Sequence, residues 1–302
     1  MAHKVKSQRR IREKMTPFYI VPLVILIVYC LFMLFMMLWA FVTTFKYQSD
    51  FRTNYLGLPK DWTLSNYAKA FSFTITVYKQ VGGATLSRGV AMPEQLLYSL
   101  LYAGGGAILQ AIVPCVIAYM TSKFRYKFSS VVNIFVIVTM TIPIVGQQPS
   151  ELQLMRTLGL YDNIIGTWVQ KFHFLGMYYL VFYATFRSLP DDYAEAAYID
   201  GASEFRVLVN IMLPLVSTTV FTVGLIKFIE FWNDYQTPLL FIPSYPTIAH
   251  GIFRLSVSTD STVATIPVRL AGCFLMAIPM IVIFVLFRNR IIGNLSMGGV
   301  KG

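Results

Sequence analysis

The stretch PFYIVPLVILIVYCLFMLFMMLWAFVTTF, residues 17–45, decides the fold class of this 302-residue chain, because no residue between Lys14 and Lys46 is charged. A helix over this stretch would be roughly 43 Å long at about 1.5 Å per residue, which exceeds the roughly 30 Å hydrocarbon core of a bilayer. A signal peptide has an apolar region of only about 7–15 residues before its cleavage site. We therefore predict a membrane-spanning helix at 17–45 that follows a basic cytoplasmic tail at 1–16.

Further apolar stretches continue along the chain, which is 56% hydrophobic and only 13% charged. Soluble domains carry about 25% charged residues. We expect an all-α integral membrane protein with six transmembrane helices. The first helix is followed by an extracytoplasmic loop at 46–93, a five-helix core at 94–290 and a cytoplasmic tail at 291–302. Within the loop, the alternation of apolar and polar residues at 71–77 fits either a short strand or an unpaired loop segment. The spans of the core are predicted at 94–122, 128–149, 164–187, 209–235 and 265–290.

The basic residues indicate the orientation. The N-terminal tail and the connections at 122–127, 187–207 and 288–302 hold 14 of the 25 lysines and arginines, whereas the short loops of the other side carry only Arg156 and Arg254. Cytoplasmic loops are enriched in Lys and Arg. Both termini are therefore expected in the cytoplasm, and the net charge of +11 is interpreted as topology, not as a nucleic-acid partner.

Motifs for chemistry are missing from the sequence. It holds no GK dipeptide, hence no phosphate-binding P-loop, and no G-x-S-x-G nucleophile motif. The spacing of His3, His173 and His250 matches no zinc motif, and the three cysteines all lie in apolar stretches. We expect no catalytic residue, no metal and no cofactor in this chain.

The segment at 188–208 differs sharply from its apolar neighbours. Pro190 with the acids after it is typical of a helix start, and Asp192 followed by Glu195 has the spacing of a capping box. This helix should run to about Ile199, with Gly201 in the left-handed conformation after it and Ser203 as the cap of a second helix. Two interpretations follow: a docking element for another protein, or a connector whose glutamate caps only its own helix.

The sequence EAAYIDGASEFRVLVNIMLP, residues 195–214, resembles the EAA-x3-G-x9-I-x-L-P signature of the membrane subunits of binding-protein-dependent ABC importers. The matching positions are Glu195, Ala196, Ala197, Gly201, Ile211, Leu213 and Pro214. This resemblance implies the type I importer permease fold with six transmembrane helices. It also implies that the 188–208 segment is a coupling loop whose glutamate faces a basic residue in a cleft of an ATPase subunit.

Other stretches resemble the maltose-type carbohydrate branch: WTLSNYAKAF at 62–71, IAYMTSKFRYKF at 117–128 and FWNDYQTPLLFI at 231–242. The ending Gly298, Gly299, Val300, Lys301 and Gly302 resembles the tail of the second permease of that branch, which reaches between the ATPase subunits. The implied partners are a second, non-identical permease, an ATPase dimer that binds ATP and Mg, and an extracellular sugar-binding protein. The chain departs from many relatives at Tyr98-Ser99, where they carry Asn-Ser, and in a longer 72–93 segment.

Polar residues within apolar stretches are candidates for a translocation path. Lys227, Glu230 and Asp234 share one face of a continuing helix, either as a path or as an interfacial salt-bridged cluster. The neighbouring Trp232 and Asn233 suit a sugar ring and its hydroxyls, although Trp is also a common interfacial anchor. Gln147 and Gln148 offer amides, and Gly104 to Gly106 favour close helix packing.

The sequence thus predicts a sugar importer permease in a bacterial or archaeal cell membrane. A self-contained transporter driven by ions through Lys227, Glu230 and Asp234 is the first alternative. The second is a polytopic enzyme that acts on lipid-linked sugars. The importer hypothesis requires ATP hydrolysis in a separate chain.

Overall fold

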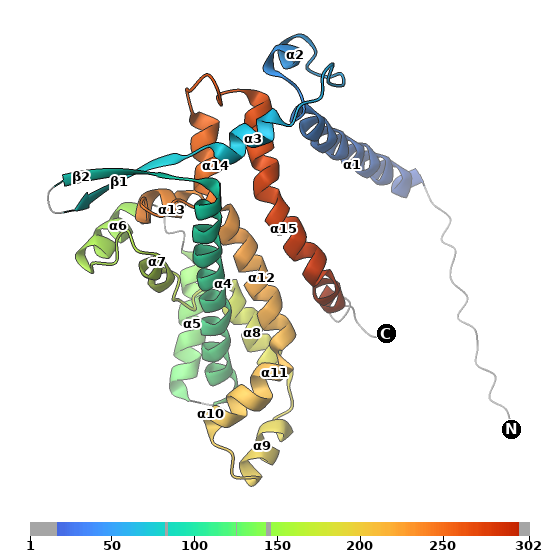
Figure 1. The fold of residues 1–302 in the computed structure, drawn as a ribbon. Coiled ribbons are helices and arrows are strands. Elements are labelled where there is room, and N and C mark those ends of the chain that lie inside the picture. Colours follow the sequence, from blue (N-terminus) through green and yellow to red (C-terminus); the bar gives the residue numbers. More distant parts are fainter. Residues whose placement is uncertain (1–16, 82–83, 125, 143–145, 296–302) are drawn as a thin grey trace.

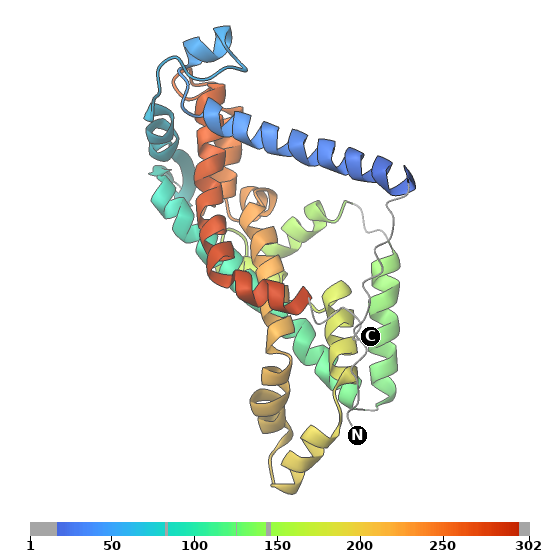
Figure 2. The same ribbon diagram turned by 90° about the vertical axis from the view of Figure 1, so that its right-hand side faces the viewer.

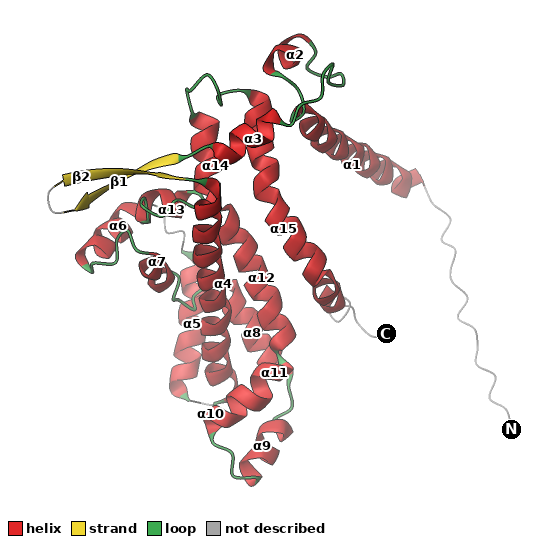
Figure 3. Cartoon of the chain, viewed as in Figure 1, coloured by secondary structure: helices red, strands yellow, loops and turns green. Residues whose placement is uncertain are grey.

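The computed structural model describes residues 17–81, 84–124, 126–142 and 146–295. Helices dominate these residues, and one β-hairpin projects from one end of the helical bundle (Figures 1 and 3). The end with the hairpin is called the outer end here, and the end with the 188–208 segment is called the inner end.

Helix α4, Met92–Lys123, is the central element of the bundle. It contacts α5 (Lys127–Thr141), α8 (Met177–Ser188) and α12 (Ser217–Asn233), which lie along it in Figure 1. Near its middle, a Cβ on Gly105 would collide with the Trp168 indole, and one on Gly106 would press on the Phe231 ring. Because Gly105 and Gly106 have no side chain, the rings of Trp168 and Phe231 can pack directly against the backbone of α4, which confirms the packing interpretation for these two glycines. A Cβ on Gly104 would meet no other atom within contact distance.

Two apolar clusters divide the bundle along α4. The inner cluster joins α4, α5 and α8 with the 188–208 segment, and its largest fully buried side chains include Tyr179, Phe182 and Phe186. The outer cluster joins Tyr102 of α4 with Trp232 of α12 and with Ile248 of α14 (Ile248–Val257). Because α4 contributes to both clusters, displacement of its inner end is opposed by packing at its outer end.

The outer end carries short elements. These are α2 (Gln48–Thr53), α3 (Ser65–Ser72), α6 (Gln148–Thr157), α7 (Ile164–Gln170) and α13 (Gln236–Phe241), together with strands β1 (Ile75–Val81) and β2 (Ala84–Val90). The strands pair antiparallel with Ile75 opposite Val90, so the strand alternative for this loop is correct, although the strand begins four residues later than the alternation.

The hairpin is fastened to α4 through side chains of β2 and of the first turns of α4. The Arg88 guanidinium of β2 lies 2.8 Å from the Glu94 carboxylate and donates to the Tyr98 hydroxyl at 3.1 Å. Tyr98 also packs edge-on against Tyr245. Tyr98 and the hairpin are therefore parts of one structural unit.

Helix α1, Pro17–Thr43, stands apart from the bundle in both views (Figures 1 and 2). Its side chains are exposed from Ile20 to Leu38, and it contacts α15 (Ile266–Leu295) through edge-on packing of Phe41 against Phe274. An apolar helix with such exposure suits lipid or another membrane helix, not water.

Among the described residues, three helices are long and apolar enough to cross a membrane: Ile20–Thr43, Met92–Lys123 and Ile266–Phe287. A bent pair, Glu204–Leu215 and Ser217–Asn233, adds a fourth if it is one span. The mostly helical architecture with apolar helices is thus as predicted, whereas the described part of the chain does not show six continuous spans.

Two predicted spans are interrupted. The span at 128–149 ends as a helix at Thr141, since Ile142 is extended before Pro143, a proline that disfavours helix at the preceding residue. The range 164–187 contains α7 and α8, separated at 171–176, where Gly176 adopts a φ of +130°. Only glycine takes such a conformation without strain, and the helix therefore restarts after it.

The predicted span at 209–235 is bent by 74°. A short helix α10, Glu204–Val207, continues as the π-helical turn η1, Leu208–Met212, and as α11, Leu213–Leu215, before α12 begins. Pro214 lies at this bend. Its ring excludes the carbonyl four residues earlier and it has no N–H to donate, which explains a widened turn before it and a break after it.

Candidate functional site

The 188–208 segment folds as two short helices at the inner end of the bundle (Figure 1). Helix α9, Asp192–Ile199, is followed by Gly201 at a φ of +78° and by α10. The backbone N–H groups of Gly201 and Ala202 donate to the carbonyls of Tyr198 and Ala197, which is the Schellman arrangement of a helix end. Ser203 then caps α10 by accepting from the Arg206 N–H. The predicted helix, bend and second cap are confirmed.

The predicted capping box is wrong. Asp191, not Asp192, occupies the cap position of α9, and its side chain makes no capping bond. Its carboxylate instead lies 2.7 Å from the ammonium of Lys123, which also donates to the Leu189 carbonyl at 2.6 Å. The last turn of α4 is therefore tied to the first residues of the segment.

The matched positions of the motif divide between surface and core. Glu195 and Ala196 are exposed, whereas Ala197 is buried in the inner cluster together with Val207. Ile211 and Leu213 pack against the same cluster, and Pro214 is exposed at the bend. The segment therefore has one face that belongs to the bundle and one face that carries a carboxylate outward.

The sequence prediction did not include two large apolar side chains that lie on the outward face of the segment. Ile199 is 86% exposed and Phe205 is 75% exposed, on either side of the turn at Gly201. Apolar groups this exposed near charged residues are typical of a protein contact surface. The sequence does contain a signal for these two residues. Both are apolar residues within an acidic stretch, and their spacing does not match the buried face of a helix. The predicted tail residues Gly298 to Gly302 lie outside the described residues.

A polar hollow of about 480 Å³ lies toward the outer end, between the last turn of α5, the start of α6, the residues after α7, and α13. Gln147 and Gln148 line it, with Glu151 and Lys171. The amide of Gln236 donates to the Gln148 side-chain oxygen at 3.4 Å. The two glutamines belong to the start of α6 instead of the end of a span, and their surroundings suit a polar ligand.

Of the three charges predicted on one helix face, two form an ion pair and the third lies beyond the end of the helix. Lys227 pairs with Glu230 at 2.8 Å, so the pair expected for an interfacial cluster forms. Asp234 lies beyond the end of α12, and one carboxylate oxygen accepts from the N–H groups of Gln236 and Thr237. The other oxygen accepts from the Tyr102 hydroxyl at 2.7 Å, so Asp234 fixes the start of α13.

Trp232 and Asn233 also have different environments. Trp232 is 1% exposed, stacks on Phe228 and donates from its indole N–H to the Met276 carbonyl. It is a core residue of the chain and not a surface for a sugar ring. Asn233 is exposed, and its amide donates to the Ile229 carbonyl.

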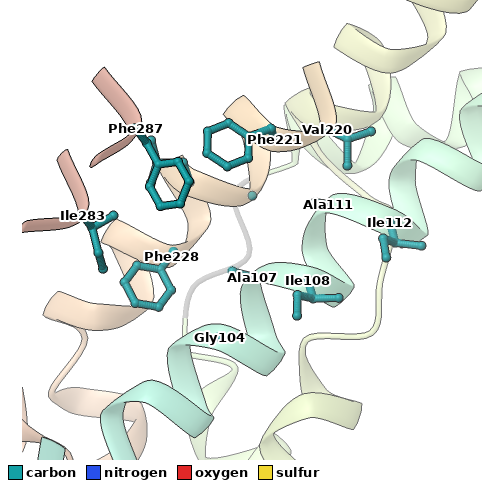
Figure 4. A pocket seen from close by; sticks show the side chains of 12 residues that line it. Gly104, Ala107, Ile108, Ala111, Ile112, Val220, Phe221, Phe228, Ile283 and Phe287 are labelled. Carbon is teal, nitrogen blue, oxygen red and sulfur yellow. The ribbon is translucent and has the colours of Figure 1, made fainter. Parts of the chain in front are cut away.

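Figure 4 shows a second hollow, of about 420 Å³, between α4, α12 and α15. Its walls are apolar, and small residues such as Ala107 and Ala111 of α4 open it against Phe228 and Phe287. A sugar needs partners for its hydroxyl groups, whereas every described residue that lines this hollow is apolar. The polar hollow, not this one, therefore has the chemistry for a polar solute.

Residues 112–296 match the protein family described as binding-protein-dependent transport system inner membrane component. The diacetylchitobiose uptake system permease protein of Streptomyces coelicolor is 24% identical over 281 residues, 91% of this chain and 86% of that protein. The trehalose/maltose transport system permease protein of Thermococcus litoralis is 26% identical over 288 residues, 89% of this chain and 92% of that protein.

A solved structure of a bacterial ABC transporter involved in the import of the acidic polysaccharide alginate contains a chain of similar fold. Its TM-score is 0.71 at 20% sequence identity, with 90% of this chain and 95% of that chain covered. The curated relatives are named as permease proteins of transport systems and not as enzymes.

Proposed function

The chain belongs to the family of binding-protein-dependent transport system inner membrane components, and on that premise we propose that it is the permease subunit of an ATP-driven importer for oligosaccharides or related sugars. Diacetylchitobiose, trehalose and maltose in the names of its relatives support this substrate class. The proposed location is the cell membrane, with both termini in the cytoplasm and the 188–208 segment on the cytoplasmic side.

The observation that carries the proposal is the outward face of the 188–208 segment. Glu195 and the apolar side chains of Ile199 and Phe205 are all exposed, while Ala197 and Val207 anchor the same segment in the bundle. If the segment were only a connector, exposing these two apolar side chains to water would be unfavourable and would serve no purpose. The face suits a cleft of the ATPase subunit, with Glu195 against a basic residue and the apolar pair against its walls.

The segment is also built to pass on movement. Lys123 joins α4 to Asp191, and Ala197 of α9 packs in the same cluster as Phe186 of α8. When ATP binding closes the two ATPase subunits, which hold the ATP and Mg, α9 moves with them. The movement of α9 is transmitted to α4 through the Lys123–Asp191 salt bridge and to α8 through the packed inner cluster, because neither contact can lengthen without being broken. The cavity between the two permeases then turns outward, where a sugar-binding protein delivers its ligand.

The translocation path follows the polar groups of the outer half. Gln147 and Gln148 in the polar hollow supply amides, and the exposed Glu230 and Asn233 extend the polar surface along α12. Asp234 and Trp232 support this surface from behind by holding α13 and the outer cluster. Hydroxyl-rich solutes are recognised by such amide and carboxylate groups.

Transport in proteoliposomes tests the proposal. The chain is reconstituted with its second permease, the ATPase dimer and the binding protein, and uptake is measured across a panel of labelled sugars. Uptake should require both ATP and the binding protein, and ATP hydrolysis should rise with the cognate sugar.

Accumulation of a solute by the chain alone on an ion gradient would instead support a secondary transporter. Turnover of a lipid-linked sugar that survives loss of residues 187–210 would support an enzyme.

A further inference from the structure

A second polar hollow lies at the inner end of the bundle, where α4 ends, α5 begins and α8 ends. Its volume is about 740 Å³, larger than the hollow near Gln148. It lies on the opposite end of the bundle from that hollow and has no part in the proposed path. Hydroxyl, amide and charged side chains make up most of its wall.

The charges of this inner hollow are mainly positive. Lys123, Lys127 and Arg187 line it, against a single carboxylate from Asp191. Lys123 is already paired with that carboxylate. Among the described residues, Lys127 and Arg187 have no carboxylate within salt-bridge distance, and the bond found for the Arg187 guanidinium is to the Tyr183 hydroxyl at 3.3 Å. Two cationic groups therefore have donors left for an anion.

The polar wall behind these cations is fixed by its own hydrogen bonds. The hydroxyls of Thr121 and Tyr179 lie 2.7 Å apart, and Tyr179 donates to the Asn133 side-chain oxygen at 2.9 Å. The Asn133 amide then donates to the Ser129 carbonyl. This chain of bonds links α4, α8 and α5, so the hollow is a preformed space and not a gap between mobile helices.

An apolar surface begins directly beside the hollow. Phe128 is 71% exposed, and Val131, Ile134 and Phe135 of α5 are also exposed. Tyr126, at the foot of α5, stacks on Phe124, as expected of an aromatic side chain at the boundary between headgroups and hydrocarbon. A basic hollow next to an exposed apolar helix face matches a molecule with an anionic end and long apolar chains.

We propose that the inner hollow binds the phosphate of an anionic phospholipid in the cytoplasmic leaflet, with Lys127 and Arg187 as its ligands. The acyl chains lie along the exposed face of α5. A guanidinium and an ammonium are the usual donors to phosphodiester oxygens, and basic pockets between membrane helices on the cytoplasmic side hold such headgroups. The leaflet rests on the proposed orientation of the chain, whereas binding itself does not depend on the transport activity.

Lipid binding to the purified full-length chain tests this site. Phosphatidylglycerol and phosphatidylcholine with the same acyl chains are titrated against the chain in detergent, and bound lipid is counted by native mass spectrometry. Phosphatidylglycerol should bind at least tenfold more tightly. Each basic residue near an anionic lipid contributes about fivefold, so the double variant K127Q/R187Q should lose about 25-fold in affinity for phosphatidylglycerol.

Matched variants and a competitor define the controls. The variant K69Q/K79Q removes two exposed lysines at the outer end and should bind phosphatidylglycerol as the wild type does. The variant K127R/R187K keeps both charges and should bind nearly as tightly, which separates charge from folding. Equal affinity for the two lipids, or wild-type affinity in K127Q/R187Q, would overturn the proposal. Displacement of the lipid by equimolar inorganic phosphate would overturn it in favour of a free-phosphate site.

Discussion

The ammonium of Lys123, in the last turn of α4, lies 2.7 Å from the carboxylate of Asp191, immediately before α9. The lysine side chain is largely buried and the aspartate is exposed. An exposed partner limits what the pair adds to stability, to about 1 kcal/mol at most. Its position gives it another role, since it joins the central helix to the segment proposed to receive movement from the ATPase.

Exchange of the two charges tests this role. Lys123→Glu and Asp191→Lys should each lower sugar-stimulated ATP hydrolysis several-fold, because like charges then separate α4 from α9. The double variant restores an opposite pair and should recover part of the activity. Hydrolysis in the reconstituted complex is the measurement, and a double variant no better than either single variant would count against the link.

Glu195→Lys should leave the protein inserted in the membrane but lower sugar-stimulated ATP hydrolysis at least tenfold, because a positive charge would then face the basic residue proposed in the cleft of the ATPase. Asp61→Lys makes the same change in charge at an exposed position of the outer end, far from the segment, and is the control that should keep wild-type coupling. Wild-type coupling in Glu195→Lys would contradict the assignment of the segment.

Gly201 adopts a φ of +78° in the turn between α9 and α10. A β-branched residue is strained in the left-handed region, and Gly201→Val should cost about 1–2 kcal/mol of local stability. Asn tolerates this region better, so Gly201→Asn should retain more coupling than the valine variant. Limited proteolysis of the segment and ATP hydrolysis measure the two effects, and equal behaviour of the two variants would exclude a conformational cause.

Trp232 and Asn233 are adjacent but should respond differently to alanine. Trp232→Ala empties a buried site and should lower the free energy of unfolding by about 3–5 kcal/mol, measured as a lower Tm in detergent. Asn233→Ala should leave the Tm nearly unchanged and raise the KM for sugar uptake, since the amide lies on the proposed path. A large loss of Tm in Asn233→Ala would assign that residue to the core instead.

His250 gives the outer end a dependence on pH. Burial and the neighbouring Arg254 lower the pKa of His250 from 6.5 to about 4, and its ring nitrogen Nε2 accepts from the Arg254 guanidinium at 3.3 Å. The unfolded chain therefore takes up a proton before the folded chain does. The free energy of unfolding is therefore independent of His250 above about pH 6.5, where the side chain is neutral in both states, and it decreases as the pH falls from 6.5 toward 4.

The size of this loss follows from the shift in pKa and is on the order of 3 kcal/mol by pH 4. The Tm of the wild type should fall between pH 7 and pH 4, and His250→Asn should fall less steeply over the same range. Parallel curves for the two proteins would assign the pH dependence to other groups.

The sequence supported the fold class and the family because both rest on local patterns. Long charge-free stretches predict apolar helices wherever they pack, and the family match confirms the resemblance drawn from the 195–214 motif. The bend at Gly201 and the cap at Ser203 were also predictable, since a turn and a cap involve only neighbouring residues. The six-span count was less secure, because Pro143, Gly176 and Pro214 fall inside three of the ranges that length and hydrophobicity predict as single spans.

The candidate site required the tertiary structure. Spacing along a helix placed Lys227, Glu230 and Asp234 on one face, but the helix ends at Asn233 and the aspartate instead holds α13. Trp232 has the chemistry of a sugar contact, and only packing against α4 and α15 decides that it is buried.

By itself, then, the sequence determined an apolar helical permease with an acidic segment at 188–208, because hydrophobic length, charge bias and turn residues act over a few neighbours. Only the tertiary structure decided which of its polar groups face outward. Lys123 meets Asp191 across 68 residues of sequence, and Lys127 and Arg187 border one hollow, because α4 and α8 end where α5 begins. Contacts of this kind arise from helix packing, which no local pattern of residues specifies.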